Sequence, residues 1–236
     1  MQALAEKSVC FIGDQPHPGN LALTQYCLSK VLLSSQARIL DAGCGEGQTV
    51  HYLQSLGYRA YGFDANIFKR QRANCQPACI AADWFHIPTL CGYFEVVLAE
   101  CTFSLIKRLK DHLAEIRRVL QPAGTLIFHG LYSRREDSEL WTGKLGDNCS
   151  LKNIRNQNQI IMELENSGFQ VIFLEDHSQV LQNNGSMNAW CWKPGLFENN
   201  EIQASVKQKE EMDIFDYFLT ISKIKLGYYV AIAKKE

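Results

Sequence analysis

The stretch that decides the fold of this chain is Arg38-Ile39-Leu40-Asp41-Ala42-Gly43-Cys44-Gly45-Glu46-Gly47. Its apolar beginning predicts a short buried strand, and its three glycines at alternate positions predict a tight loop. Residues 48–56 then carry the apolar pattern of a helix that ends at Gly57. A strand, a glycine loop and a helix start bring bare backbone N–H groups against a ligand. We therefore expect a small molecule to bind at this loop.

Strand and helix patterns alternate on both sides of this loop. The predicted strands are 38–41, 59–64, 79–83, 94–100, 125–129, 169–174 and 227–233. The predicted helices are 21–33, 48–56, 66–74, 109–120, 157–166 and 200–224. Such alternation predicts an α/β fold in which helices cover both faces of a mostly parallel sheet, giving three layers.

Length and composition narrow the class of protein. The 236 residues fit one domain, residues 1–236, in which residues 1–35 form an N-terminal segment and helix. The net charge of -1 gives no attraction to nucleic acid, and no stretch approaches the ~20 apolar residues of a membrane span. Nine cysteines without a paired Cys-x-x-Cys spacing indicate reduced thiols and no metal site. We expect a cytoplasmic protein without a nucleic-acid or membrane partner, and the sequence leaves its oligomeric state open.

Polar residues end five of the predicted strands. They are Asp41, Asp64, Asp83, Glu100 and His129. Ligands of open α/β sheets bind outside the carboxyl ends of the strands. One such residue is commonly a turn former or a helix cap, whereas five in succession indicate a polar ligand site.

Asp64 points to a nucleoside ligand. It lies 21 positions after Gly43, where a carboxylate accepts hydrogen bonds from ribose hydroxyls. A nicotinamide dinucleotide and S-adenosylmethionine are the two alternatives. The dinucleotide pattern G-x-G-x-x-G has Gln48 at its third glycine here, and Glu46 would repel a pyrophosphate. An anionic loop instead suits a ligand that carries an ammonium and a sulfonium.

At these residues the chain resembles the class I S-adenosylmethionine-dependent methyltransferases, most closely those that act on small molecules. The resemblance runs from about Leu23 to Leu174. It is carried by residues 39–47, Asp64, 82–84, 94–100, 116–126 and 168–171. Ala123 replaces the first glycine of the usual R-V-L-x-P-G-G segment, a departure that affects a structural bend. The resemblance implies a Rossmann-like sheet of seven strands, with the last strand antiparallel and inserted beside the sixth.

The resemblance also implies a site for S-adenosylmethionine. The expected cofactor-binding residues are Asp41, Gly43, Cys44, Gly45, Asp64, Ala65, Asp83, Trp84, Glu100 and Gly19. Asp83 would contact the adenine amine and Trp84 the ring. Residues 131–158 and 177–225 would be elaborations on the acceptor side, where aromatic residues such as Trp141, Trp190 and Trp192 stack on an acceptor.

The implied reaction is in-line attack of an acceptor atom on the sulfonium methyl, which releases S-adenosylhomocysteine. Glu100 and His129 are the candidate catalytic residues, and one of them would orient or deprotonate the acceptor. Glu100 as a contact to the cofactor's amino group and His129 as a satisfied imidazole are the alternatives. Other functions that stay open are a catalytically idle cofactor-binding scaffold, an NAD-dependent oxidoreductase, and a metalloid methyltransferase that uses Cys101. The small-molecule acceptor is not identified by the sequence.

Overall fold

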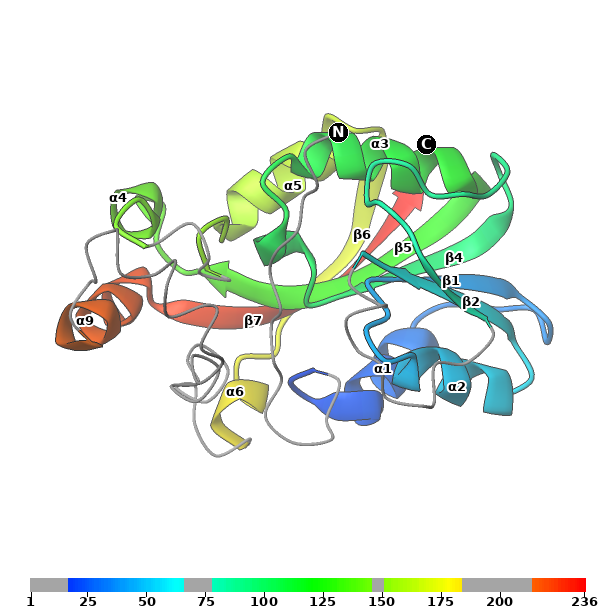
Figure 1. Ribbon diagram of the computed structural model, residues 1–236, viewed down its shortest axis with the longest axis horizontal. Coiled ribbons are helices and arrows are strands. Elements are labelled where there is room, and N and C mark those ends of the chain that lie inside the picture. The colour runs from blue at the N-terminus through cyan, green and yellow to red at the C-terminus, as the bar shows by residue number, and fades with distance from the viewer. Residues whose placement is uncertain (1–16, 66–77, 146–150, 184–213) are drawn as a thin grey trace, which may run out of the picture.

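The computed structural model describes residues 17–65, 78–145, 151–183 and 214–236, and a single sheet joins these parts (Figure 1). Its strands are β1 (Arg38–Ala42), β2 (Arg59–Asp64), β3 (Cys79–Ala81), β4 (Phe94–Glu100), β5 (Leu120–Ser133), β6 (Phe169–Asp176) and β7 (Leu226–Lys235). Their order is β3-β2-β1-β4-β5-β7-β6. Strand β7 runs antiparallel between β5 and β6, whereas the other described pairs are parallel. The predicted sheet and its inserted last strand are confirmed.

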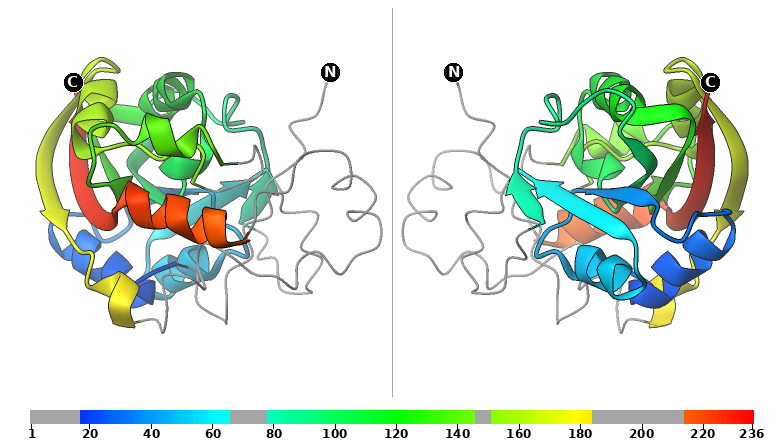
Figure 2. Two further views of the ribbon diagram at one scale, coloured as in Figure 1. Left: turned by 90° about the vertical axis from the view of Figure 1, so that its left-hand side faces the viewer. Right: turned by 90° about the vertical axis from the view of Figure 1, so that its right-hand side faces the viewer.

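Helices cover both faces of the sheet, as Figures 1 and 2 show. One face carries α1 (Asn20–Ser29), α2 (Gln48–Ser55) and α6 (Val180–Asn183). The opposite face carries α3 (Leu109–Val119) and α5 (Gln157–Glu165). The short helices α4 (Glu139–Thr142) and α9 (Ile214–Ile224) lie together beyond the end of β5. The three predicted layers are therefore present.

Alternation along β4 decides which side chains face which helices. Val96 and Leu98 belong to the apolar core under α1 and α2, and Val97 and Ala99 belong to the core under α3 and α5. Both faces are apolar because helices bury both of them. Since side chains alternate along a strand, Glu100 continues the row of Val96 and Leu98. Its carboxylate is therefore directed under the α1 and α2 layer.

Strand β5 is longer than the sequence predicts. Residues 125–129 were expected, but residues 130–133 also pair, with residues 226–229 of β7. The prediction that His129 ends a strand is wrong for this reason. Likewise β3 ends at Ala81, so Asp83 lies in the following turn. The predicted helix 66–74, most of the predicted helix 200–224, Trp190 and Trp192 lie outside the described residues.

Ala123 lies in a bend of the backbone at the start of β5, where the family pattern has glycine. Its φ angle is 57°, in the left-handed region that costs an L-residue about 1–2 kcal/mol. The expected effect of this substitution on a structural bend is thus visible as local backbone strain.

No helix within the described ranges is long and apolar enough to cross a membrane.

Candidate functional site

The glycine loop lies at the carboxyl ends of β1 and β2. Gly43, Gly45 and Gly47 have φ angles of 89°, 56° and 81°, a backbone region that glycine enters at little cost. The backbone N–H groups of Gly43 and Cys44 donate to the carbonyl of Phe63, at 2.8 and 3.0 Å. These bonds tie the loop to β2 and hold it in a fixed position at the edge of the sheet.

Gly43 has close neighbours that leave no room for a side chain. A Cβ atom there would lie 2.5 Å from Cη2 of Trp84 and 2.6 Å from Cγ2 of Thr102. The hydroxyl of Thr102 is buried and has no hydrogen-bond partner among the described residues. A buried polar group without a partner needs one, and a polar ligand beside Gly43 would supply it. Thr102 was not predicted from the sequence, although it follows the end of β4 by two residues.

Asp41 is a buried carboxyl group below the glycine loop. It is 2% exposed and makes no ion pair in the described part of the chain. Burial, and then the charge of Glu100, raise its pKa well above the usual value. A bound cation would stabilise the ionised form of Asp41, so this site fits a ligand with a positively charged group.

Asp64 and Asp83 have different surroundings. An oxygen of the Asp64 carboxylate accepts from the backbone N–H of Gly45 at 3.1 Å, and Ala65 beside it is exposed. Asp83 is exposed and accepts from the backbone N–H of Phe85 at 3.0 Å. Asp64 is therefore part of the loop site, whereas Asp83 is seen to cap its own turn.

Trp84 is directed toward the core as well as toward Gly43. Its ring lies edge-on to the rings of Phe63 and His112, with centroid distances of 5.2 and 4.8 Å. The backbone carbonyl of Trp84 also lies 3.1 Å from Nδ1 of His112. These contacts fix the ring as part of the wall behind the glycine loop.

Glu100 is the centre of a buried polar cluster. The hydroxyls of Thr24 in α1 and Thr49 in α2 donate to its two oxygens, each at 2.8 Å. Nε2 of His129 lies 3.0 Å from Oε1, and Nε2 of His17 lies 3.2 Å from Oε2. The Glu100 side chain is only 7% exposed. The sequence does not predict the contacts of Thr24, Thr49 and His17 with Glu100, because a threonine in a helix carries no distinctive signal.

The titration of this cluster follows from its contacts. Burial raises the pKa of Glu100, but the charge and hydrogen bonds of His17 and His129 outweigh burial and hold it well below its usual value. Burial lowers the pKa of His17, yet Glu100 outweighs it and the net shift is upward. Burial and the charge of His17 lower the pKa of His129. The cluster therefore favours an ionised Glu100, a charged His17 and a neutral His129.

The cluster continues from His129 into β7. Nδ1 of His129 lies 2.8 Å from the hydroxyl oxygen of Tyr228, which lies 2.9 Å from Sγ of Cys101. Cys101 has a φ angle of 56° and directly follows Glu100. A non-glycine residue in this region stores strain, and such strain is frequent at functional sites. Both ring nitrogens of His129 are thus engaged by protein groups.

The remaining predicted residues have structural contacts. Gly19 has a φ angle of 85° at the start of α1, and a Cβ atom there would lie 2.9 Å from Cβ of Leu23. Cys44 is buried, and its Sγ would lie 2.7 Å from a Cβ atom added at Gly62. The centroid of the Trp141 ring lies 4.8 Å from Nζ of Lys144. The ring also packs against a small apolar cluster that includes Leu145 and Ile221. A contact of any of them with a cofactor or acceptor stays a prediction.

One group of three potential metal ligands occurs among the described residues, and it contains no cysteine. It consists of His17, Glu100 and His129. Cys101, the residue suggested for metalloid binding, instead contacts Tyr228. The described residues therefore contain no thiol cluster around Cys101.

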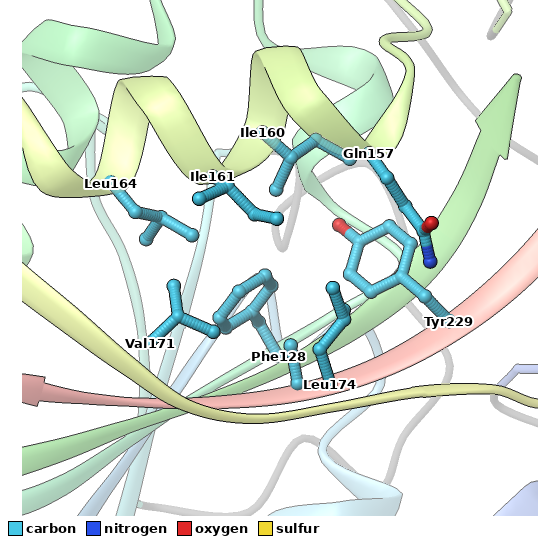
Figure 3. A pocket seen from close by; sticks show the side chains of 9 residues that line it. Phe128, Gln157, Ile160, Ile161, Leu164, Val171, Leu174 and Tyr229 are labelled. Atoms are coloured by element: carbon cyan, nitrogen blue, oxygen red, sulfur yellow. The ribbon is translucent and has the colours of Figure 1, made fainter.

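An apolar crevice between α5 and the sheet lies on the face opposite Glu100. Ile160, Ile161 and Leu164 of α5 point toward Phe128 and Val171 of the sheet (Figure 3). The crevice is too narrow to hold a water molecule. It is a seam in the packing of α5 and carries none of the polar groups described above.

The central part of the chain is similar to known methyltransferases. Residues 40–128 match a family model described as a methyltransferase domain. The uncharacterized methyltransferase YodH of Bacillus subtilis (strain 168) is 38% identical over 118 residues, which are 47% of this chain and 50% of YodH. The chain thus spans about half the length of this curated relative.

Solved structures share the fold over nearly the whole chain. Phosphoethanolamine N-methyltransferase 2 of Haemonchus contortus, in complex with S-adenosyl-L-methionine, matches with a TM-score of 0.62 and 16% identity, over 93% of this chain and 53% of that one. The [4+2]-cyclase SpnF matches with a TM-score of 0.61 and 20% identity, over 91% of this chain and 80% of that one. At these identities the likeness shows the fold alone.

Proposed function

We propose that this chain, in which residues 40–128 match a methyltransferase-domain family model, is a class I S-adenosylmethionine-dependent methyltransferase and transfers a methyl group from S-adenosylmethionine to a small molecule. The observation that carries the proposal is the buried Asp41, which makes no ion pair with any residue that the structure describes, below a glycine loop with positive φ angles. An anionic group at this place suits a ligand whose amino acid end carries an ammonium and a sulfonium. It does not suit the pyrophosphate of a dinucleotide, which Glu46 in the same loop would also repel.

Different residues around the loop would bind different parts of the cofactor. Asp64 at the end of β2 would accept the ribose hydroxyls, as the same position does in the resembling family. Gly43, Cys44 and Gly45 would hold the methionine end, with Asp41 below its ammonium. The hydroxyl of Thr102 supplies a further donor beside Gly43.

The adenine end would lie near Asp83, Trp84 and Ala65. The Trp84 ring packs against the rings of Phe63 and His112, which already cover part of its surface. We therefore assign recognition of adenine chiefly to the Trp84 backbone and the Asp83 carboxylate. Gly19, within the segment His17-Pro18-Gly19-Asn20, would lie over the methionine end.

S-adenosylmethionine supplies an activated methyl group, so the chain mainly has to align the acceptor and exclude water. Glu100 and His129 are the proposed groups for this step. Glu100 accepts from the Thr24 and Thr49 hydroxyls and lies 3.2 and 3.0 Å from Nε2 of His17 and His129. Both ring nitrogens of His129 are engaged by protein groups. These contacts favour an orienting role over proton abstraction. The acceptor side would be formed by residues 131–158 and 177–225.

The alternative is a chain that binds the cofactor and transfers no methyl group. The full engagement of Glu100 and His129 by protein groups favours it, because neither offers a free base. The fold does not distinguish these two functions, since it also occurs in the [4+2]-cyclase SpnF. The two functions share the cofactor site and differ in turnover.

Calorimetry with S-adenosylhomocysteine and NAD tests the cofactor assignment. We expect S-adenosylhomocysteine to bind more tightly, and Asp64→Ala to weaken it by roughly 10- to 100-fold, the loss expected for hydrogen bonds to a charged group. Asp137→Ala, at an exposed aspartate that pairs with Arg135, is the control. Tighter binding of NAD would overturn the assignment. Transfer of a labelled methyl group to members of an acceptor library then separates the methyltransferase from the idle scaffold.

A further inference from the structure

Three side chains from separate parts of the chain converge under α1 and α2. They are His17 before α1, Glu100 at the end of β4 and His129 within β5, and their ligand atoms all lie within 4.8 Å of one another. The two histidine Nε2 atoms lie 3.2 and 3.0 Å from the two Glu100 oxygens. Ligands about 2.1 Å from a tetrahedral Zn²⁺ are separated by about 3.4 Å. The observed spacing is therefore close to that of a metal site.

Both imidazoles have the outer partners that metal-binding histidines need. The Nδ1–H group of His17 donates to the backbone carbonyl of Pro18 at 3.0 Å. Nδ1 of His129 lies 2.8 Å from the hydroxyl oxygen of Tyr228. A metal-binding histidine almost always donates its other N–H to such an oxygen, which fixes the ring and its tautomer. In both residues this arrangement leaves Nε2 facing Glu100.

The Glu100 carboxylate is also held as a ligand would be. Thr24 donates to Oε1 and Thr49 donates to Oε2, so each oxygen has one outer partner and one histidine neighbour. Nε2 of His17 faces an anionic oxygen of Glu100, and its Nδ1–H donates to Pro18. A divalent cation that replaces the Nε2 proton would lie between the imidazole and the carboxylate and be attracted by the carboxylate charge.

We propose that His17, Glu100 and His129 bind a divalent transition-metal ion of the class that includes Zn²⁺, Fe²⁺ and Mn²⁺. Two imidazoles and one carboxylate suit these ions better than Mg²⁺ or Ca²⁺, which prefer oxygen ligands. Three protein ligands leave at least one coordination position for a water molecule or for a hydroxyl or thiol of a substrate. The proposal concerns binding and does not depend on methyl transfer.

The test is titration of the purified full chain with Co²⁺, after removal of bound metals by dialysis. We expect about one ion per chain, a visible absorption band from nitrogen and oxygen ligation, and displacement by Zn²⁺. His17→Ala and His129→Ala should each weaken binding at least tenfold, and His129→Ala should also change the band. His51→Ala is the matched control, because His51 is an exposed histidine on α2 and its loss should leave binding unchanged.

Two results would overturn the proposal. One is wild-type protein, folded by circular dichroism, that shows no Co²⁺ band, retains no metal by mass spectrometry and has the same unfolding temperature with and without Zn²⁺. The cluster would then be a carboxylate paired with a protonated imidazole. The other is Co²⁺ binding that is unchanged in both His17→Ala and His129→Ala, which would place the ion elsewhere. The wild-type measurements stay decisive even where a variant fails to fold.

Discussion

His129 faces Glu100 directly across the pair β4 and β5, with Nε2 of the imidazole 3.0 Å from Oε1 of the carboxylate. The register of two adjacent parallel strands fixes this contact. The other partners of Glu100, His17, Thr24 and Thr49, reach it from the helical layer. Changes in that layer can therefore alter the cluster while the sheet stays intact.

Replacing Thr24 by valine should lower the free energy of unfolding by about 1–3 kcal/mol. The substitution keeps the shape of the side chain but removes a buried hydroxyl that donates to Glu100 at 2.8 Å. Thr24→Ser keeps the hydroxyl and serves as the control, with a smaller expected loss. Urea unfolding of both variants measures the difference. Equal stability of the valine and serine variants would show that the hydrogen bond contributes nothing.

Acidification should destabilise the protein through His112. Burial lowers the pKa of this residue from 6.5 to about 4. Between these pH values the unfolded chain binds a proton that the folded chain does not bind, so the free energy of unfolding falls as the pH falls. The expected slope is up to about 1.4 kcal/mol per pH unit, and it disappears above pH ~6.5.

The variant His112→Gln isolates this contribution. His17 has a raised pKa and acts in the opposite direction, so only the difference between wild type and variant reports on His112. Urea unfolding at pH 7 and pH 5 should show a smaller pH dependence for the variant. An identical loss of stability in both proteins would refute the assignment of a neutral, buried His112.

Replacing Ala123 by glycine should stabilise the fold by about 0.5 kcal/mol. Relief of a left-handed φ angle contributes about 1–2 kcal/mol, and the greater freedom of glycine in the unfolded chain offsets about 0.4–1 kcal/mol of it. Ala114→Gly, at an exposed position of α3, is the matched control and should destabilise by up to about 1 kcal/mol. Thermal unfolding that shifts in the same direction for both variants would contradict the strain at Ala123.

Binding of S-adenosylhomocysteine should weaken as the pH falls through the raised pKa of Asp41. This prediction rests on the proposed function, in which the ligand's ammonium lies above the Asp41 carboxylate. The ammonium stays charged while the carboxyl group takes up a proton, so the attraction is lost at a pH well above 3.8. Calorimetry should show this dependence in the wild type and a weaker, flatter profile in Asp41→Asn. If the affinities of the wild type and of Asp41→Asn depended on pH in the same way, Asp41 would have no part in cofactor binding.

Much of the fold could be predicted because its signals are local. The bounds of β2 and β4 agree with the predicted 59–64 and 94–100, since both strands are short apolar runs that end at an acidic residue. The extension of β5 to Ser133 could not be predicted, because its partner is β7, nearly a hundred residues further along the chain.

The candidate site also has parts that depend on local sequence and parts that depend on distant contacts. The glycine loop and Asp41 lie within one motif, so the sequence alone predicts that they are close together. The partners of Glu100 come from three elements far apart in the chain, with Thr24 separated from it by 76 positions. Alternation along β4 from Val96 and Leu98 would have shown that Glu100 faces α1 and α2. It would not have shown which side chains of those helices reach it.

The position of β7 between β5 and β6 has a consequence for how the protein is made. On the ribosome β5 and β6 emerge before the strand that joins them, and within the described sheet β6 pairs with β7 alone. Until residues 226–235 have emerged, β6 is an unpaired strand whose backbone and apolar side chains can associate with other chains. A nascent chain paused before Leu226 therefore presents an open sheet edge on which other chains can add a strand.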